Sequence, residues 1–278
     1  MSSGFSHLCF RIIIIFLLFQ TTTCSKSIIK NENRLEEPKI DNAALLVKRI
    51  KELNNRSPHT YSTNFLIEGI IKGKKVKLAG NTIFNNNPRR IKIDFIDAIF
   101  KSPLITVVQN NDLVKIYFPI EKKLFLDNIN TIDISNYANI EINIQILYDL
   151  FSGSIPLIKD YTTKKALKPS SKKISKIEGP IFLILKNINF YQTISFKNNI
   201  PDKILWVNRK NNEKVEVYLE GPRINQDINF YNTIRLVHPK QNCRITLQFK
   251  EIKFNIPVDI KKIVKINLHR DVKIIKMI

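Results

Sequence analysis

The sequence has few of the residues from which catalytic and metal sites are built. Among its 278 residues are 4 histidines, 3 cysteines and 7 glycines. No His-Glu-x-x-His motif or closely spaced cysteine pair occurs, so a zinc site has no ligand set. The stretch at residues 69–73, Gly-Ile-Ile-Lys-Gly, has the wrong spacing for a phosphate loop, and no Ser or Thr follows its lysines. We expect neither an enzyme nor a bound cofactor.

Long apolar runs are missing except near the start of the chain. Ile12 to Phe19 form an uninterrupted apolar run, which Arg11 precedes. A helix that crosses a bilayer needs about 20 apolar residues, so this run is too short to span one. A positive residue, a short apolar stretch and small residues before a cleavage position are typical of a secretory signal peptide. We predict a signal peptide over residues 1–23 and a soluble body after it.

Cys24 follows the predicted signal peptide directly. The stretch Thr-Thr-Thr-Cys resembles a bacterial lipoprotein signal, in which the cysteine receives a diacylglycerol, although Thr21 stands where Leu is usual. We predict lipidation of Cys24; the alternative is a plain secreted protein that is cut near the same place. Residues 24–40 are polar and mixed in charge, as expected of a tether between the anchor and a single domain over residues 41–278. Cys243 would then stay unpaired.

Acidic residues are in the minority. The chain has 24 Asp plus Glu against 45 Lys plus Arg, which gives a formal net charge of +21. This excess favours anionic partners, which include membrane headgroups, acidic protein surfaces and nucleic acid. Lys, Asn and Ile are all abundant, as the coding bias of an AT-rich genome would also produce. Because an exported chain seldom meets nucleic acid, we expect an anionic membrane surface as a partner and no nucleic acid.

Most of the predicted domain alternates between apolar and polar residues with a period of two. An amphipathic helix comes first, with Asp41 and Asn42 as its N-cap, Leu46, Ile50 and Leu53 on one face, and an end near residues 54–58. Antiparallel strands joined by short turns follow. The predicted strands cover residues 61–73, 74–84, 89–95, 103–109, 113–119, 180–187, 203–210, 214–221, 228–237 and 244–254.

Two stretches between the predicted strands have a different character. Residues 140–153 fit both the helical and the extended period, and we predict a helix over their second half, which ends at Gly153. Residues 162–176 are polar and rich in lysine, so we predict a loop or an insertion there.

The apolar faces of the strands are candidates for a binding surface. A sheet of about ten strands twists and curls, and it encloses either a filled core or a cavity that suits hydrocarbon. The pattern allows both. The candidate lining residues are Phe65, Ile67, Leu78, Phe84, Ile91, Ile93, Phe95, Val114, Ile116 and Phe118.

Several motifs occur in an order that resembles a known family. They are the helix before the first strand, FLIEGIIKGKKVKLAGNTIF, NPRRIKIDF, PLITVVQNNDLVKIYFP, LYDLFSG and ITLQFKEIKFNIPVD, and together they span residues 43–260. As a set they resemble the LolA/LolB-like superfamily of outer-membrane lipoprotein-sorting carriers and receptors. The resemblance implies a mostly β (α+β) fold: an incomplete, strongly curved antiparallel β-barrel of about ten or eleven strands, with a few covering helices and an apolar cavity for acyl chains.

The resemblance also implies roles for particular residues. In the family's soluble carrier an arginine before the proline of the third strand holds a lid closed; Asn87 stands there in this chain, so Arg89 or Arg90 replaces it only if the side chain points inward. In the family's receptor, which is itself a lipoprotein, an exposed apolar residue after the third strand aids membrane insertion. Ile99 and Phe100 are the matching candidates, and burial under a neighbouring helix is the alternative.

With Cys24 as an anchor, the receptor-like function fits better than the carrier-like one. The chain would bind acyl chains of lipoproteins or phospholipid, receive them from a periplasmic carrier and pass them to the outer membrane. It would sit on the periplasmic side of the cell envelope, anchored to the outer membrane through Cys24. Two alternatives are an envelope-stress sensor or interaction lipoprotein with the same half-barrel, and a lipid-anchored scaffold.

Overall fold

A computed structural model describes residues 35–36, 41–97, 99–129, 144–169, 180–224 and 228–276. The predicted signal peptide, Cys24 and most of the predicted tether lie outside the described residues. Within the described part of the chain, no helix has both the length and the apolar character needed to cross a bilayer.

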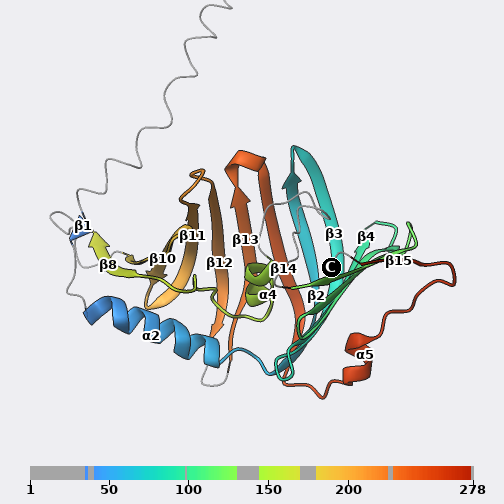
Figure 1. Cartoon of the computed structure of the whole chain (residues 1–278). Coiled ribbons are helices and arrows are strands. Elements are labelled where there is room, and N and C mark those ends of the chain that lie inside the picture. The colour runs from blue at the N-terminus through green and yellow to red at the C-terminus, as the bar shows by residue number, and fades with distance from the viewer. Residues whose placement is uncertain are drawn as a thin grey trace, which may run out of the picture.

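Fifteen strands form one continuous sheet in the order β1-β8-β9-β10-β11-β12-β13-β14-β2-β3-β4-β5-β6-β7-β15 (Figure 1). The strands are β1 (Leu35–Glu36), β2 (Thr60–Ile71), β3 (Lys74–Asn85), β4 (Arg90–Asp97), β5 (Pro103–Asn110), β6 (Leu113–Phe118), β7 (Lys123–Asn128), β8 (Thr163–Pro169), β9 (Ile181–Lys186), β10 (Phe190–Lys197), β11 (Ile200–Asn208), β12 (Lys214–Ile224), β13 (Asn229–His238), β14 (Cys243–Phe254) and β15 (Lys273–Lys276). The helices are α2 (Asp41–Asn55), α4 (Ile144–Phe151), α5 (Ile260–Val264) and the 3₁₀ turn η2 (Pro239–Gln241).

The sheet is strongly curved and stays open, because its first and last strands, β1 and β15, do not pair with each other. Figure 1 shows the strands at one end of the sheet, β4 to β7 and β15, lying at a steep angle to those in its middle, while α2 and α4 lie on one side of it. Every pairing is antiparallel except that of β15 with β7. The predicted fold class, an incomplete antiparallel barrel with a few helices, is confirmed.

The first and second helices also lie where the sequence predicts them. Helix α2 begins at Asp41 and buries Ala43, Val47, Ile50 and Leu53, which share one face at helical spacing. Helix α4 covers the second half of the ambiguous stretch. Gly153 follows it with φ = +78°, a conformation that glycine adopts without steric strain.

The prediction of a loop at residues 162–176 is wrong over its first half, because β8 pairs there with β9. This strand needs few apolar residues, since it lies near the edge of the sheet; Ala166 is its buried residue and Leu167 is half-buried. The sequence also missed β10, where Gln192 interrupts the apolar face. Its side chain is buried, but it donates to the Pro156 carbonyl (2.7 Å) and accepts from the Ile158 amide (3.0 Å).

The sheet contains more strands than the predicted ten or so, because β1, β7, β8, β10 and β15 were not expected. Strand β1 falls within residues 24–40, where the sequence predicts a tether, and it pairs over only two residues with β8.

The concave face of the sheet carries the main core. The ring of Tyr61 packs on Phe84 with centroids 5.2 Å apart and on Phe230 at 5.3 Å, and Phe230 contacts Phe249 at 5.0 Å. All four side chains are buried. Because β14 pairs with β2, residues from both ends of the domain meet in this core.

The convex face of β4 to β7 is covered by the C-terminal segment that follows β14. Val108, Tyr117 and Leu124 are buried on this face, and Ile263 of α5, which packs against β4 and β5, is buried as well. The His269 amide donates to the Tyr117 hydroxyl at 3.3 Å. The segment ends in β15, which extends the sheet beyond β7.

Candidate functional site

The sequence-predicted lining residues all lie on the concave face. Residues directly opposite each other on paired strands share a face, and Ile67 is opposite Leu78 while Phe84 is opposite Ile91. Ile93 is likewise opposite Val107, which is opposite Ile116. Whether these residues line an acyl cavity stays a prediction.

The candidates divide into two groups. Phe65, Phe84, Ile91 and Ile93 are buried in the main core, with Ile67 and Phe95 partly buried against it and Leu78 half-buried on β3. Val114 and Ile116 belong to a smaller cluster with Ile129, against which Ile105, Val107, Phe118 and Phe125 pack as partly buried residues.

Helix α4 covers the first group. It lies over the middle of the sheet (Figure 1), where Phe151 contacts Phe65 with ring centroids 6.1 Å apart and Tyr148 contacts Phe84 at 5.9 Å. The Tyr61 hydroxyl donates to the Phe151 carbonyl. A ligand that reaches Phe65 or Phe84 therefore has to displace α4.

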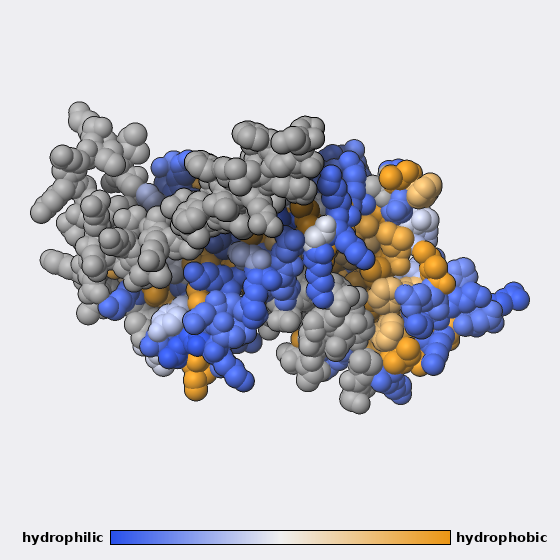
Figure 2. Space-filling model, turned by 90° about the horizontal axis from the view of Figure 1, so that it is seen from above, coloured by the Kyte–Doolittle hydropathy of each residue, from blue (hydrophilic) through white to orange (hydrophobic). Residues whose placement is uncertain are grey.

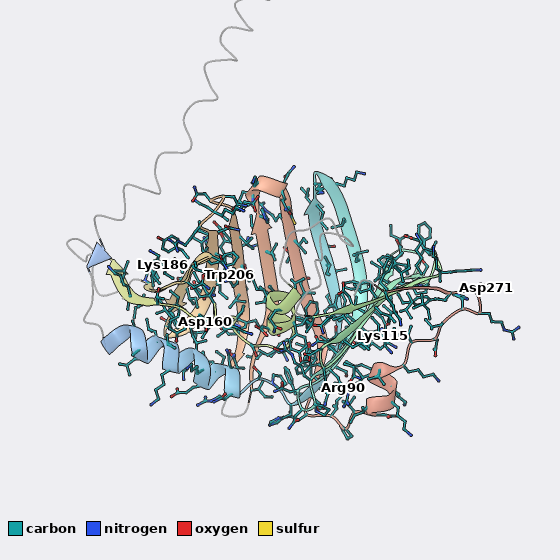
Figure 3. All side chains as sticks on the ribbon, viewed as in Figure 1. Arg90, Lys115, Asp160, Lys186, Trp206 and Asp271 are labelled. Atoms are coloured by element: carbon teal, nitrogen blue, oxygen red, sulfur yellow. The ribbon has the colours of Figure 1, made fainter. Side chains whose placement is uncertain are left out.

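Arg89 holds α4 from the side of the sheet. Its guanidinium carbon lies 3.5 Å from the centroid of the Tyr148 ring, and its Nη2 lies 3.3 Å from Oδ1 of Asp149. Gln145 donates to the same Oδ1 at 2.7 Å. Arg90 points elsewhere, since its Nε donates to Asn110 of β5 at 2.7 Å, at the end of the sheet where β4 begins (Figure 3). Of the two arginines considered from the sequence, Arg89 is the one that reaches the helix.

Burial dominates the titration of the groups that Arg89 contacts. It raises the pKa of Asp149 even though Gln145 and Arg89 act in the opposite direction. Burial also raises the pKa of Tyr148 to about 12, against the lowering effect of Arg89. The Tyr148 hydroxyl has no hydrogen-bond partner within the described residues. Arg89 thus offsets only part of the effect of burial on the pKa values of Tyr148 and Asp149.

The turn after α4 is fixed much more firmly than the helix. Asn54, at the end of α2, accepts a hydrogen bond from the Ile155 amide (2.7 Å) and donates one to the Ile155 carbonyl (3.0 Å). A Cβ atom at Gly153 would lie 2.7 Å from the Asn229 carbonyl oxygen. Helix α4 is therefore fixed at its C-terminal end, whereas Arg89 contacts it only at Tyr148 and Asp149.

Ile99 and Phe100 are exposed in the turn between β4 and β5, with 76% and 82% of their surface accessible. The alternative of burial under a neighbouring helix is therefore wrong. Asp97 shapes the turn, because its Oδ1 accepts the amides of Ile99 (2.8 Å) and Phe100 (2.7 Å), and its carbonyl accepts the amide of Lys101 (3.0 Å).

Sequence reasoning missed the partners of Arg89, which are Tyr148 and Asp149 in the LYDLFSG helix. It also missed Ile120, in the turn between β6 and β7, of whose surface 74% is exposed. Within the described residues, no group of His, Cys, Asp and Glu is arranged to hold a metal ion. Cys243 is buried as a free thiol, and burial raises its pKa, which disfavours the thiolate.

No family model matches the sequence, and no curated protein is similar enough to be matched. Among solved structures, the chain is similar to one described as an outer membrane lipoprotein-sorting protein domain from Vibrio parahaemolyticus, with a TM-score of 0.58 and 10% identity over 80% of this chain and 95% of that one. A DUF1329 family protein from Desulfovibrio piger gives a TM-score of 0.54 and 9% identity over 82% and 98%. The LolA superfamily protein NE2245 from Nitrosomonas europaea gives 0.51 and 10% over 80% and 97%. The chain shares its fold with these proteins, one of which is described as a LolA superfamily protein, and this is the fold that the sequence motifs predicted.

Proposed function

We propose that this protein binds acyl chains of lipoproteins or lipids on its concave face and passes them to the outer membrane. It would act from the periplasmic side of the envelope, anchored through a lipid on Cys24, and would receive its cargo from a periplasmic carrier. The observation that carries the proposal is a largely apolar face on an open, curved sheet, whose middle is covered by α4, the short helix that Arg89 contacts. Such transfer makes and breaks no covalent bond, so it needs neither catalytic residues nor a cofactor.

Cargo binding requires α4 to move, and the contacts of Arg89 oppose this only weakly. A half-exposed ion pair contributes about 0.2–1 kcal/mol, and a cation–π contact about 0.5–1 kcal/mol. An acyl chain gains about 0.8 kcal/mol for each methylene that it buries. Burial of about two or three methylenes therefore offsets the contacts of Arg89. The firm turn at Gly153 would let the helix swing without detaching.

Delivery requires the concave face to approach a bilayer. The lipid on Cys24 would keep the domain near the membrane, and the exposed pair Ile99 and Phe100 would enter the interface. The excess of basic residues would attract anionic headgroups or an acidic donor and raise the rate of encounter.

The proposal is tested by titrating the delipidated protein with a fluorescent fatty acid. We expect saturable binding that Ile67→Ser, on the concave face, weakens about tenfold, the equivalent of losing one partly buried apolar side chain. Leu66→Ser is the matched control, because Leu66 is the half-buried neighbour on the opposite face of β2. Absence of binding by the unaltered chain, or an equal loss in both variants, would overturn the proposal.

The anchor is tested separately by mass spectrometry of the mature N-terminus. An acylated Cys24 is the expected result. A chain that begins at another residue, or an unmodified Cys24, would remove the receptor role and leave a soluble carrier.

A further inference from the structure

Two neighbouring turns form an exposed corner of the sheet. Because β4 to β7 are consecutive antiparallel strands, the β4–β5 and β6–β7 turns lie at the same end of the strands. Strands lie about 4.8 Å apart, so these turns are separated by about 10 Å. We call Ile99, Phe100 and Ile120, which these turns expose, the apolar corner.

The apolar corner stands out among the described residues. Their four most exposed large apolar side chains are Ile188 (83%), Phe100 (82%), Ile99 (76%) and Ile120 (74%), and the last three are in the corner. Figure 2, seen from above, shows hydrophobic surface among hydrophilic side chains at the end of the molecule formed by β4 to β7 and β15. Single exposed apolar residues are ordinary, whereas a group of them indicates a contact surface.

The second turn, like the first, is held in place by the chain itself. The Lys122 amide donates to the Pro119 carbonyl at 3.3 Å, and the Lys273 amide of β15 donates to the Lys122 carbonyl at 2.9 Å. Ile120 is therefore presented by a turn that the C-terminal segment supports. Apolar side chains on a fixed turn lose little backbone entropy when they insert into a binding partner or a bilayer.

The charges around the apolar corner are mixed, with a small excess of lysines over carboxylates. Lys101, Lys122, Lys123 and Lys273 lie in or beside the two turns. Glu121 is paired with Lys123 at 2.7 Å, and Asp271, at this end of the molecule (Figure 3), with Lys122 at 3.6 Å. Asp97 is engaged with backbone amides.

The β2–β3 turn, which lies at the same end of the strands, adds more positive charge. It carries Lys72, Lys74 and Lys75, all exposed, and no carboxylate in its turn. A lysine near an anionic bilayer contributes about 1 kcal/mol of attraction. Exposed apolar side chains with lysines nearby therefore match a bilayer with anionic headgroups, in which hydrocarbon lies directly beneath the negative charges.

We propose that the apolar corner is a docking surface for an anionic lipid bilayer, with Ile120 as a second insertion point beside Ile99 and Phe100. This inference rests on the proposed function and deepens it, because it adds Ile120 and the lysines of the neighbouring turns to the surface that meets the bilayer. Docking through this corner would place the end of the sheet formed by β4 to β7, rather than its β8 end, at the membrane.

The chain provides a matched control at its other end. In the β9–β10 turn, Asn187 Oδ1 accepts the amides of Asn189 (2.9 Å) and Phe190 (2.7 Å), which repeats the arrangement around Asp97 and exposes Ile188. Figure 3 shows Lys186 and Asp271, which mark the two ends, on opposite sides of the molecule. Ile188 is thus as exposed as the corner residues, in a turn of the same kind, but lies outside the corner.

The experiment is co-sedimentation of the full mature chain, carrying Cys24→Ser to remove the anchor, with two kinds of vesicle. One is phosphatidylcholine alone and the other contains phosphatidylglycerol as well. We expect binding to the anionic vesicles only, reduced by 0.5 M salt as surface attraction is screened. We expect Ile120→Ser to lower the partition coefficient about fivefold to tenfold, Ile99→Ser with Phe100→Ser to lower it further, and Ile188→Ser to leave it unchanged.

Binding that ignores phosphatidylglycerol, an unchanged Ile120→Ser variant, or an equal loss in Ile188→Ser would each overturn the inference. Fatty-acid binding, measured on the same variants, separates it from the proposed function. The corner variants should bind fatty acid like the parent chain. A parent chain that binds anionic vesicles but no fatty acid would refute acyl transfer and leave the docking surface standing.

Discussion

The concave face of the sheet has two unequal halves. In the half under α2 and α4, which we call the packed half, Tyr61, Phe84 and Phe230 are fully buried and touch ring to ring. In the half over β5 to β7, the thin half, Val114 and Ile116 form a small cluster, and Phe118 and Phe125 remain partly buried with ring centroids 5.7 Å apart. The packed half supplies stability, whereas the thin half leaves apolar rings partly exposed within the described part of the chain.

The largest expected effect belongs to the packed half. Phe84→Ala removes a fully buried ring that contacts Tyr61 and Tyr148, and we expect the free energy of unfolding to fall by about 3–5 kcal/mol. Phe118→Ala, in the thin half, should lower it by about 1 kcal/mol. Urea denaturation measures both. Equal losses would show that the two halves are packed alike.

The next effect concerns the fixed end of α4. Gly153→Ala places a side chain at φ = +78° and a Cβ atom 2.7 Å from the Asn229 carbonyl oxygen, so the turn has to shift. We expect a loss of about 1–3 kcal/mol in unfolding free energy and faster amide exchange in α4. Hydrogen exchange measured residue by residue tests this. Protection of α4 that is no lower than in the parent chain would mean that the turn does not fix the helix.

A smaller effect is expected where α4 is held loosely. Arg89→Met removes the contacts to Tyr148 and Asp149, and we expect fatty-acid affinity to rise about threefold to tenfold, because about 1 kcal/mol no longer opposes the movement of the helix. Arg90→Met is the control, since Arg90 bonds Asn110 instead. A rise in both variants, or in neither, would contradict the role of Arg89.

One further effect is confined to alkaline pH and concerns tyrosines of the packed half. Burial raises the pKa of Tyr61, and it raises that of Tyr148 to about 12. The folded state therefore keeps protons that the unfolded chain releases near pH 10, so stability is full below pH 10 and falls as the pH rises through 12. Tyr148→Phe should flatten this fall in denaturation curves between pH 9 and 12. An unchanged slope would show that Tyr148 does not contribute.

The strands with clean alternation could be predicted from the sequence, and the others could not for physical reasons. Strand β10 was missed because Gln192 points into the core, where its amide is satisfied by backbone groups that lie 34 and 36 residues away along the chain. Strand β8 was missed because it lies next to the edge strand β1, where a strand needs little apolar surface. Neither feature leaves a periodic signal.

The site was predicted in part. Arg89 could have been preferred over Arg90, because odd-numbered residues of β4 such as Ile91 and Ile93 point inward, and residue 89 has the same parity. The exposure of Ile99, Phe100 and Ile120 had no such rule, since side chains in turns do not follow the strand period. Their direction depends on hydrogen bonds such as those of Asp97, which only the folded chain reveals.

The C-terminal segment has a consequence beyond covering the convex face. A strand at the margin of a sheet offers unpaired amide and carbonyl groups, which can recruit a strand from another molecule and start polymerisation. In this protein four residues of β15 occupy that position beside β7. By pairing with β7, β15 occupies the backbone groups that a strand from another molecule could otherwise use, and it leaves only its own four residues at this margin.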